Sequence, residues 1–395
     1  MAWVEHKDYE IVLRDPESVL RRCLGSEIRV VDFESDDFVK TGDNYGSTIK
    51  KVRVKLSRDD GDGKDHPEVL DLVAKMLPPT DFQREMFDSG FTFKKEIFLY
   101  ETLIPVYRSL LPDFDAVPRF YGARVSREPG TKEIDEDAVI FLENLKAKGY
   151  YMVDRHKGLD TSHLKLAIRA LARFHAVGLS IKHRKPDFLP ILKQYGTPLA
   201  VKDDVMSTYV NSFMEQLRAD DQGAPYVDRV LATKTRQLSE SYYSPLAAEH
   251  EWACTCHGDN WVNNLMFHRD DRGVDDVKMV DFQTFYLSSP LTDLVFLLCS
   301  SMELPIVGFD EALELYRRSA ADALGELHCD ASLFSGESFH GRLKIDAANE
   351  LFHVMLMTKV VELGDGENFE KSGLNEACLR RARRILDIYA NKGWI

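Results

Sequence analysis

Cysteine is scarce in this sequence, with six among 395 residues. A chain of this length can bury a sufficient core without covalent staples, so these few cysteines exclude a disulfide scaffold and favour a reducing, cytoplasmic setting. Long hydrophobic runs are also missing. The longest strongly apolar stretch, Leu294–Cys299, is far too short to span a bilayer. The N-terminal segment MAWVEHKDYEIVL has no apolar core or cleavage site, so no secretory signal is expected.

An excess of positive charge is lacking as well. The 51 Lys and Arg residues are outnumbered by 65 Asp and Glu residues, which gives a formal net charge of −14. Such a surface repels phosphate backbones and anionic lipids, so we expect neither a nucleic-acid nor a membrane partner. A nucleotide ligand remains compatible with this charge, because its site needs only a few local cations and a metal ion. Apolar and charged fractions of 44% and 29% are ordinary for globular proteins and exclude disordered and fibrous classes.

The residues up to Glu143 are predicted to be rich in strands. Within 49–56, Val52 and Val54 alternate with Arg53 and Lys55, which is typical of a half-buried strand. The Gly- and Asp-rich run Arg58–Glu68 is predicted to be a turn. The strands expected in this part lie at 28–33, 49–56, 68–76 and 138–142, with one helix at 91–103.

From Asn144 onward the hydrophobic period becomes helical. Asp160–Gly178 begins with an N-cap candidate, and its final glycine is predicted to end the helix. Further helices are predicted around 202–218, 226–241, 310–324, 343–362 and 375–391. The sequence therefore predicts an α+β chain with a β-rich N-terminal lobe, residues 1–143, and a helix-rich C-terminal lobe, residues 144–395.

The most informative segment runs from Cys256 to Gln283. It turns at His257-Gly258-Asp259 and places Asn264 five residues after Asp259. The apolar runs LMF and VKMV follow, separated by an acidic turn at 269–276, and Asp281 comes at the end of the second run. This is a β-hairpin pattern, and a hairpin brings its two ends together. We therefore expect Asp259, Asn264 and Asp281 to converge.

Two carboxylates and an amide that converge in this way suit phosphoryl transfer. Mg²⁺ prefers oxygen ligands, and transfer needs a carboxylate at the attacking hydroxyl with metal over the phosphates. The spacing Asp-x₄-Asn followed by a later Asp-Phe is typical of kinase catalytic and metal-binding loops.

A kinase-type site also makes demands upstream. It requires a strand lysine that holds the nucleotide phosphates and a helical glutamate that holds the lysine. Lys75 ends the third predicted strand, and Glu96 lies on the next predicted helix. The turn at 42–47 lies between the first two strands, where its backbone amides would cover the phosphates. Each feature alone is a weak signal. The turn at 42–47, Lys75, Glu96 and the segment from Asp259 to Asp281 nevertheless occur in the order that a kinase-type site requires.

HGDNWVNN followed by VDFQ resembles the aminoglycoside phosphotransferase and choline kinase superfamily, and most of all its insect branch, the ecdysteroid kinase-like proteins. TGDNYGS, LVAKMLP, FKKEIFLYETLIP and LARFHA support the resemblance. It implies a two-lobed, protein-kinase-like fold and an enzyme that uses ATP and Mg²⁺ to phosphorylate an alcohol.

The resemblance also implies roles for particular residues. Asp259 matches the catalytic base, Asn264 and Asp281 match the metal ligands, and Lys75 with Glu96 matches the phosphate-anchoring pair. The remaining assignments are Asn44, Tyr45, Gly46 and Ser47 over the phosphates, Glu143 and Leu145 at the adenine, and His257 and Asp293 as structural support of the catalytic loop.

Departures from the protein kinases point to a small acceptor. HGD replaces H-R-D, DFQ replaces D-F-G, and the full G-x-G-x-x-G is absent. Only a few residues separate Asp281 from the helix predicted at Leu291, which leaves no room for an activation loop or a peptide platform. The family likeness makes an ecdysteroid the leading acceptor. Choline, an aminoglycoside or a lipophilic xenobiotic stays open, and the acidic charge balance suits a cationic acceptor equally well.

Other functions make different demands on the sequence. A non-catalytic pseudokinase would keep the fold and bind nucleotide without turnover. A metallophosphatase would need a His-rich ligand set that the sequence lacks. Cys254 and Cys256 have no second Cys/His pair at zinc spacing, so no zinc is expected. His175 is predicted to be a satisfied core histidine. Tyr242, Tyr243, Trp252 and Trp261 either line an acceptor pocket or, more commonly for such spacings, belong to the core.

Overall fold

The computed structural model describes the chain except for residues 1–8, 39–45, 60–64, 201–202, 238–244 and 365–371. The chain divides into two units. Unit 1 comprises Met1–Val106 and Val117–Tyr150, and unit 2 comprises Tyr107–Ala116 and Tyr151–Ile395.

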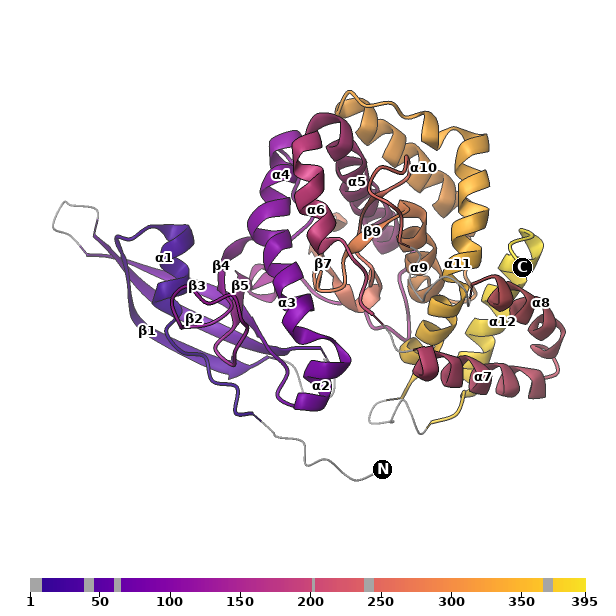
Figure 1. Cartoon of the computed structure of the whole chain (residues 1–395), viewed down its shortest axis with the longest axis horizontal. Coiled ribbons are helices and arrows are strands. Elements are labelled where there is room, and N and C mark those ends of the chain that lie inside the picture. The colour runs from indigo at the N-terminus through magenta and orange to yellow at the C-terminus, as the bar shows by residue number, and fades with distance from the viewer. Residues whose placement is uncertain (1–8, 39–45, 60–64, 201–202, 238–244, 365–371) are drawn as a thin grey trace. The chain divides into compact units, whose positions relative to one another are not determined.

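Unit 1 is built around a five-stranded antiparallel sheet in the order β1-β2-β3-β5-β4 (Figure 1). Helix α1 packs on β1 and β4. The elements that begin in this unit are α1 (Pro16–Leu24), β1 (Ile28–Asp37), β2 (Thr48–Asp59), β3 (Asp65–Met76), α2 (Asp81–Met86), α3 (Ser89–Phe98), the π-helix η1 (Leu99–Leu103), α4 (Ile104–Leu110), β4 (Phe120–Arg124), β5 (Val139–Glu143) and the 3₁₀ helix η2 (Leu145–Lys148).

The alternation along β2 has the predicted effect. Val52 and Val54 are fully buried in the core of unit 1, whereas Arg53 and Lys55 are exposed. The turn predicted at Arg58–Glu68 is wrong in its bounds, because β2 and β3 stay paired out to Asp59 and Asp65. Charged residues can take part in a two-stranded ladder when their side chains face solvent, so composition alone placed the turn too widely.

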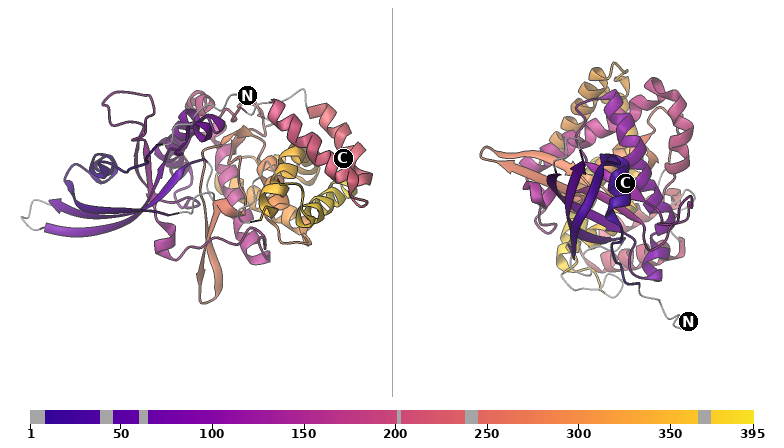
Figure 2. Two further views of the ribbon diagram at one scale, coloured as in Figure 1. Left: turned by 90° about the horizontal axis from the view of Figure 1, so that it is seen from below. Right: turned by 90° about the vertical axis from the view of Figure 1, so that its left-hand side faces the viewer.

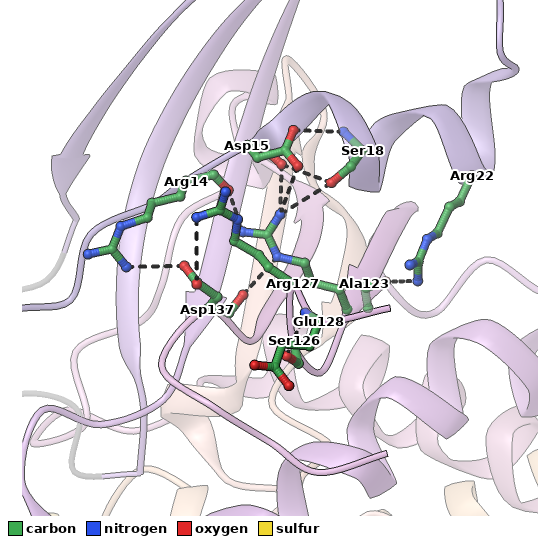
Figure 3. Close-up of polar contacts among 10 residues, drawn as sticks. Arg14, Asp15, Ser18, Arg22, Ala123, Ser126, Arg127, Glu128 and Asp137 are labelled. Carbon is green, nitrogen blue, oxygen red and sulfur yellow. Dashed lines mark hydrogen bonds and ion pairs between the residues drawn. The ribbon is translucent and has the colours of Figure 1, made fainter. Parts of the chain in front are cut away.

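The segment before α1 is fastened to the sheet by a buried arginine of β4. Arg124 donates from Nε to the Asp137 carbonyl (2.8 Å) and from Nη1 to the Asp15 carbonyl (2.7 Å). Its Nη2 donates to the Arg14 carbonyl. Figure 3 shows the surrounding contacts, including the ion pair of Arg14 with Asp137. The three carbonyl oxygens accept hydrogen bonds from the guanidinium, and these bonds offset the free-energy cost of burying its charge.

The helix predicted at 91–103 is confirmed as α3 and η1, which α4 continues. The sequence pattern did not reveal that Leu99–Leu103 forms a π-turn. Single π-turns within α-helices often occur near functional sites. Here the π-turn begins three residues after Glu96.

Unit 2 is mainly helical, with α5 packed against α10 and α9 against α11. Every residue of α9 is buried. The elements that begin in this unit are α5 (Thr161–Arg184), η3 (Pro186–Phe188), α6 (Leu189–Tyr195), α7 (Asp203–Ala219), α8 (Ala224–Gln237), β6 (Cys254–Cys256), η4 (Val262–Asn264), β7 (Leu265–Asp270), β8 (Gly273–Met279), β9 (Tyr286–Ser288), α9 (Pro290–Ser301), α10 (Phe309–Glu326), η5 (Ser332–Phe334), α11 (Gly336–Glu362) and α12 (Glu376–Asn391).

Helix α5 begins as predicted but does not end as predicted. The Asp160 side chain accepts the amide hydrogens of Ser162 and His163 and so caps the N-terminus. Gly178 lies inside the helix. A Cβ built there would lie 2.8 Å from the Tyr107 hydroxyl, so this glycine serves close packing rather than termination.

The predicted hairpin is confirmed as β7 and β8, which pair antiparallel. Figure 2 shows it as a ribbon that projects from the rest of unit 2. A second short pair, β6 and β9, flanks the segment that contains Asp259. The predicted α+β class, with a β-rich N-terminal and a helix-rich C-terminal part, is therefore confirmed. Among the helices that the structure describes, none combines the length and apolar character needed to cross a membrane.

Candidate functional site

Lys75 and Glu96 form a buried ion pair in unit 1. Lys75 lies near the end of β3 between Ile49 of β2 and Ile140 of β5, and Glu96 lies on α3. The Lys75 Nζ is 2.5 Å from the Glu96 Oε2, and their side chains are 5% and 0% exposed. A buried carboxylate at this distance holds the ammonium in one place, as a phosphate-binding lysine requires.

The residue before Glu96 on α3 is another buried lysine. Lys95 is fully buried, and burial lowers the pKa of its amine to about 7. Its Nζ lies 5.1 Å from the centre of the Phe91 ring. Lys95 therefore carries only part of a positive charge at neutral pH.

The turn before β2 is described only at its end. Gly46 forms a bend and Ser47 is buried. Asn44 and Tyr45, which the sequence also assigned to the phosphate-covering turn, lie outside the described residues.

The segment assigned to adenine begins at the end of β5. The Glu143 amide donates to the Arg119 carbonyl (2.9 Å), and the Glu143 carboxylate pairs with Lys148. Leu145 is buried and begins η2. The assignment of Glu143 and Leu145 to the adenine stays a prediction.

The candidate base and a candidate metal ligand are hydrogen-bonded to each other in unit 2. The Asn264 Nδ2 donates to the Asp259 carbonyl (2.8 Å) and to its Oδ2 (2.9 Å). Burial raises the pKa of the Asp259 carboxyl well above its ordinary value, and the charge of Asp281 raises it further. The predicted approach of these three residues is thus present in the structure.

Asp281 follows β8 in a strained backbone conformation. Its φ of 65° lies in the left-handed region, which a non-glycine residue adopts at a cost of about 1–3 kcal/mol. Its carboxylate influences the pKa of both Asp259 and His257. Asn264 bonds Asp259 through its Nδ2 atom, so its Oδ1 atom takes no part in these two hydrogen bonds. An amide oxygen and a carboxylate are ligands that Mg²⁺ prefers, so this donor set fits the ion.

The backbone of the candidate catalytic loop, residues 257–264, is held by the first turn of α9. The Asp293 carboxylate accepts the amide hydrogens of His257 (2.5 Å) and Gly258 (3.0 Å). It also receives the Nε2 hydrogen of His175 at 3.1 Å. Burial alone would raise the pKa of Asp293, but the bond from His175 keeps it below the ordinary value.

His175 is buried with both ring nitrogens bound, as predicted for a satisfied core histidine. Its Nδ1 lies 2.7 Å from the Tyr316 hydroxyl of α10. Burial opposes the charged form, yet hydrogen bonds with Asp293 and Cys256 raise the pKa of His175 to about 9. An imidazolium therefore pairs with Asp293 at neutral pH, next to the candidate catalytic loop.

His257 connects the loop to the end of β8. Its Nε2 lies 3.0 Å from the Val280 carbonyl, and its Nδ1 accepts the Asp259 amide hydrogen at 3.3 Å. Its ring packs on Phe282 at 4.4 Å between centres. Burial lowers the pKa of His257, which favours the neutral tautomer that these two bonds require.

Gly258 has a conformation that only glycine adopts easily. Its φ is 81°, and a Cβ built there would lie 2.7 Å from the Thr284 carbonyl oxygen. The loop can pass this close to Thr284 because no side chain intervenes.

Three potential soft-metal ligands also meet in unit 2. Ligand atoms of His175, Cys254 and Cys256 lie within 4.8 Å of one another, and all three residues are buried. The two thiols are 4.0 Å apart. Both nitrogens of His175 are already bound, however, and burial raises the pKa of the Cys256 thiol well above its ordinary value. These features favour hydrogen-bonded thiols, so the absence of zinc stays a prediction.

Two aromatic residues contact this loop and its support. The Tyr316 hydroxyl lies 2.7 Å from the His175 Nδ1, and the Trp261 amide donates to the Asp259 carbonyl at 3.2 Å. Trp261, which the sequence left open between an acceptor pocket and the core, is buried, whereas Tyr242 and Tyr243 lie outside the described residues. Tyr316 carried no signal, because it lies 141 residues from His175 in the sequence.

Several solved structures are similar to this chain. They include an ethanolamine kinase from Plasmodium vivax, with 12% identity, a TM-score of 0.42, and coverage of 93% of this chain and 84% of that one. A choline kinase from Cryptosporidium parvum has 10% identity and a TM-score of 0.45 over 91% and 89% of the two chains. The GDP complex of aminoglycoside 2′-phosphotransferase-IIIa has 12% identity and a TM-score of 0.42 over 95% and 97%. A comparison with curated proteins found no match.

The family relationship rests on the sequence. A model of the ecdysteroid kinase-like family matches residues 41–329, a range that contains β2, β3, the Lys75–Glu96 pair and all residues from His257 to Asp293. The match thus covers more than half of the chain and every residue to which a role was assigned. The chain belongs to the ecdysteroid kinase-like family.

Proposed function

We propose that this protein is a phosphotransferase that moves the γ-phosphoryl group of ATP to a hydroxyl of a small molecule, with Mg²⁺ as cofactor. The observation that carries the proposal is the arrangement at Asp259. Its carboxylate is held by Asn264, lies within electrostatic reach of Asp281, and belongs to a loop fixed by Asp293. This arrangement supports a positioned base next to an oxygen-rich metal site.

In the proposed step, Asp259 accepts the proton of the acceptor hydroxyl. The hydroxyl oxygen forms a bond to the γ-phosphorus, while the bond from phosphorus to the β–γ bridging oxygen breaks and its electron pair leaves on ADP. Positioning and charge neutralisation supply most of the catalysis in such transfers. A raised pKa makes Asp259 a better proton acceptor than an ordinary aspartate near neutral pH.

Asn264 and Asp281 would hold Mg²⁺, whose charge neutralises the phosphate oxygens when it is bound. In residues 1–143, the proposed nucleotide-binding part, Lys75 would contact the phosphates while Glu96 fixes its ammonium. The backbone at Gly46 and Ser47 would cover the phosphates. Residues 144–395 would carry out catalysis and bind the acceptor.

An ecdysteroid hydroxyl is the leading acceptor, because the family is described as ecdysteroid kinase-like. Its phosphate ester would be far more polar than the steroid. Other alcohols of small molecules belong to the same reaction class and serve as comparison compounds in the test.

The test is an acceptor screen with purified protein. ATP consumption and acceptor phosphorylation would be measured with ecdysteroids, choline, aminoglycosides and phenolic glycosides, each with Mg²⁺ and with EDTA. We expect transfer to an ecdysteroid that EDTA abolishes. Nucleotide binding without transfer to any compound would contradict the proposal and favour a pseudokinase.

A further inference from the structure

Three side chains of unit 2, those of Tyr151, His163 and Asp160, form a continuous chain of hydrogen bonds. The Tyr151 hydroxyl lies 2.9 Å from the His163 Nε2, and the His163 Nδ1 lies 2.8 Å from the Asp160 Oδ1. Asp160 is the N-cap of α5, and His163 lies in the first turn of that helix. A hydroxyl, an imidazole and a carboxylate in this order are the arrangement in which enzymes activate a nucleophile.

The Asp160 carboxylate determines which nitrogen of His163 carries the hydrogen. It accepts the amide hydrogens of Ser162 (2.8 Å) and His163 (3.1 Å). Burial alone would raise the pKa of Asp160, but the hydrogen bonds from His163 and Ser162 lower it, so the group is an ionised acceptor. The His163 Nδ1 is therefore the donor to Asp160. The Nε2 of the neutral ring then carries no hydrogen and accepts the Tyr151 O–H.

Backbone bonds and ring packing hold the hydroxyl and the imidazole in place. The Tyr151 amide donates to the Phe267 carbonyl of β7, and the Phe267 amide donates to the Tyr151 carbonyl, both at 2.8 Å. The His163 ring stands edge-on to the Phe267 ring at 4.8 Å between centres, and its side chain is 7% exposed. Proton transfer between the two groups thus needs little rearrangement.

A cation faces the tyrosine from the β7–β8 hairpin. The Arg269 guanidinium lies 5.6 Å from the centre of the Tyr151 ring. Its charge attracts the negative charge that develops on the phenol as the proton leaves. Tyr151 is half-buried and the Asp160 side chain is 55% exposed, so the chain of hydrogen bonds reaches the surface.

We propose that Tyr151 is a nucleophilic tyrosine and a site of covalent modification by activated acyl donors, the class of acyl phosphates and aryl esters. The Tyr151 Oη forms a bond to the acyl carbon, and its proton passes to the His163 Nε2. The bond from that carbon to the leaving oxygen breaks, and its electron pair departs on the phosphate or phenolate. The product is an O-acyl tyrosine, and the imidazolium stays paired with Asp160 until it releases the proton to solvent. None of these groups belongs to the set assigned to phosphoryl transfer, so this reactivity does not depend on the proposed function.

Acetylation by p-nitrophenyl acetate, followed by peptide mass spectrometry, tests the reactivity. Tyr150 is the matched internal control, because it is adjacent to Tyr151, is also half-buried and falls in the same tryptic peptide. Both nitrogens of His163 are bound by Asp160 and Tyr151, so Tyr150 receives no help from that base. We expect Tyr151 to be acetylated about 10²-fold faster than Tyr150, a typical contribution of a general base. Equal rates at the two tyrosines would overturn the inference.

Two variants connect the reactivity to the chain of hydrogen bonds. His163→Gln removes the base. Asp160→Asn keeps a good N-cap residue for α5 but removes the carboxylate that fixes the tautomer. In both variants the rate at Tyr151 should fall toward that at Tyr150. His156→Gln replaces an exposed histidine of the same segment and should leave the rate unchanged. A wild-type rate at Tyr151 in His163→Gln would assign its reactivity to something other than this base.

A measurement on the unmodified protein checks the tautomer. The chain has 12 histidines, and loss of one set of ¹⁵N signals in His163→Gln assigns those of His163. In the neutral ring, Nδ1 should carry the hydrogen and Nε2 should carry none. The reverse tautomer would end the case for an activated Tyr151, because Nε2 would then donate to the hydroxyl instead of taking its proton.

Discussion

The Nε2 atom of His175 lies 3.1 Å from the Oδ2 atom of Asp293, and neither side chain is exposed to solvent by more than 3%. The same carboxylate receives the amides of His257 and Gly258. A residue of α5 and a residue of α9 together therefore set the backbone of the loop that carries Asp259. His175 acts on the loop through this carboxylate.

This pair predicts a dependence of stability on pH. The pKa of His175 is about 9 in the folded protein, against an ordinary value of about 6.5. A raised pKa stabilises the folded state fully below pH 6.5, and this contribution is lost as pH rises through 9. Its size is about 3 kcal/mol. The excess stability of the wild type over His175→Gln should therefore shrink between pH 6.5 and 9.

Urea unfolding at several pH values checks this prediction. His156→Gln is the control, because His156 is exposed in the same unit. The control should follow the wild type at every pH. A constant difference between the wild type and His175→Gln from pH 6 to 9.5 would show that the histidine is neutral when folded.

Replacing the base should abolish turnover and spare the fold. Asp259→Asn is isosteric and should lower kcat by about 10²- to 10⁴-fold, since the amide cannot accept the proton. ATP affinity, measured by calorimetry, should stay close to that of the wild type. Asp271→Asn in the exposed β7–β8 turn is the control and should behave as wild type. Near-normal kcat in Asp259→Asn would move the base to another residue.

The pH profile of the wild type gives a separate prediction. Because the pKa of Asp259 is raised, the ionised base is lost on acidification well above pH 4. The acidic limb of kcat/KM should lie correspondingly high. A profile that stays flat down to the ordinary aspartate range would contradict the environment described for Asp259.

Breaking the Lys75–Glu96 pair should cost both stability and nucleotide binding. Glu96→Gln leaves a buried ammonium without its carboxylate, which typically costs about 3–5 kcal/mol. The double variant Lys75→Met/Glu96→Leu should recover part of that stability while ATP binding remains impaired. Lys51→Ala removes an exposed lysine of β2 and should change the free energy of unfolding by less than about 0.5 kcal/mol. Equal losses in all three proteins would argue against a specific ion pair.

Two glycines should respond to alanine in opposite ways. Gly258→Ala would force a Cβ to within 2.7 Å of the Thr284 carbonyl at a positive φ, so we expect lower stability and reduced kcat. Gly341 lies inside α11 with no atom within 4 Å of a built Cβ. Gly341→Ala should therefore stabilise the protein by about 0.5–1 kcal/mol. Melting temperatures and kcat of the two variants check both signs.

Local patterns in the sequence were sufficient for much of the fold. Alternation identified β2, and capping identified the start of α5 at Asp160. Gly178 shows where such patterns fail, because its role depends on Tyr107, which is distant in the sequence. A glycine required for packing and a glycine that ends a helix look alike in one sequence.

The candidate site likewise contains contacts that the sequence predicted and contacts that it did not. Asp259 and Asn264 are close in sequence, and the hairpin pattern brought Asp281 to them, so their approach was predictable. The support of Asp293 by His175, and of His175 by Tyr316, was not. Both bonds join helices more than a hundred residues apart, and a buried histidine has the same apolar spacing whether or not it meets a carboxylate.

The burial of α9 has a consequence for how the catalytic loop moves. All of α9 is buried, and Asp293 in its first turn accepts the amide hydrogens of His257 and Gly258. Those hydrogens can exchange with deuterium only when their bonds to Asp293 break. Because α9 is buried, this requires much of unit 2 to open. Surface loops usually exchange within seconds to minutes. Here two loop amides should persist as long as those of the core helices.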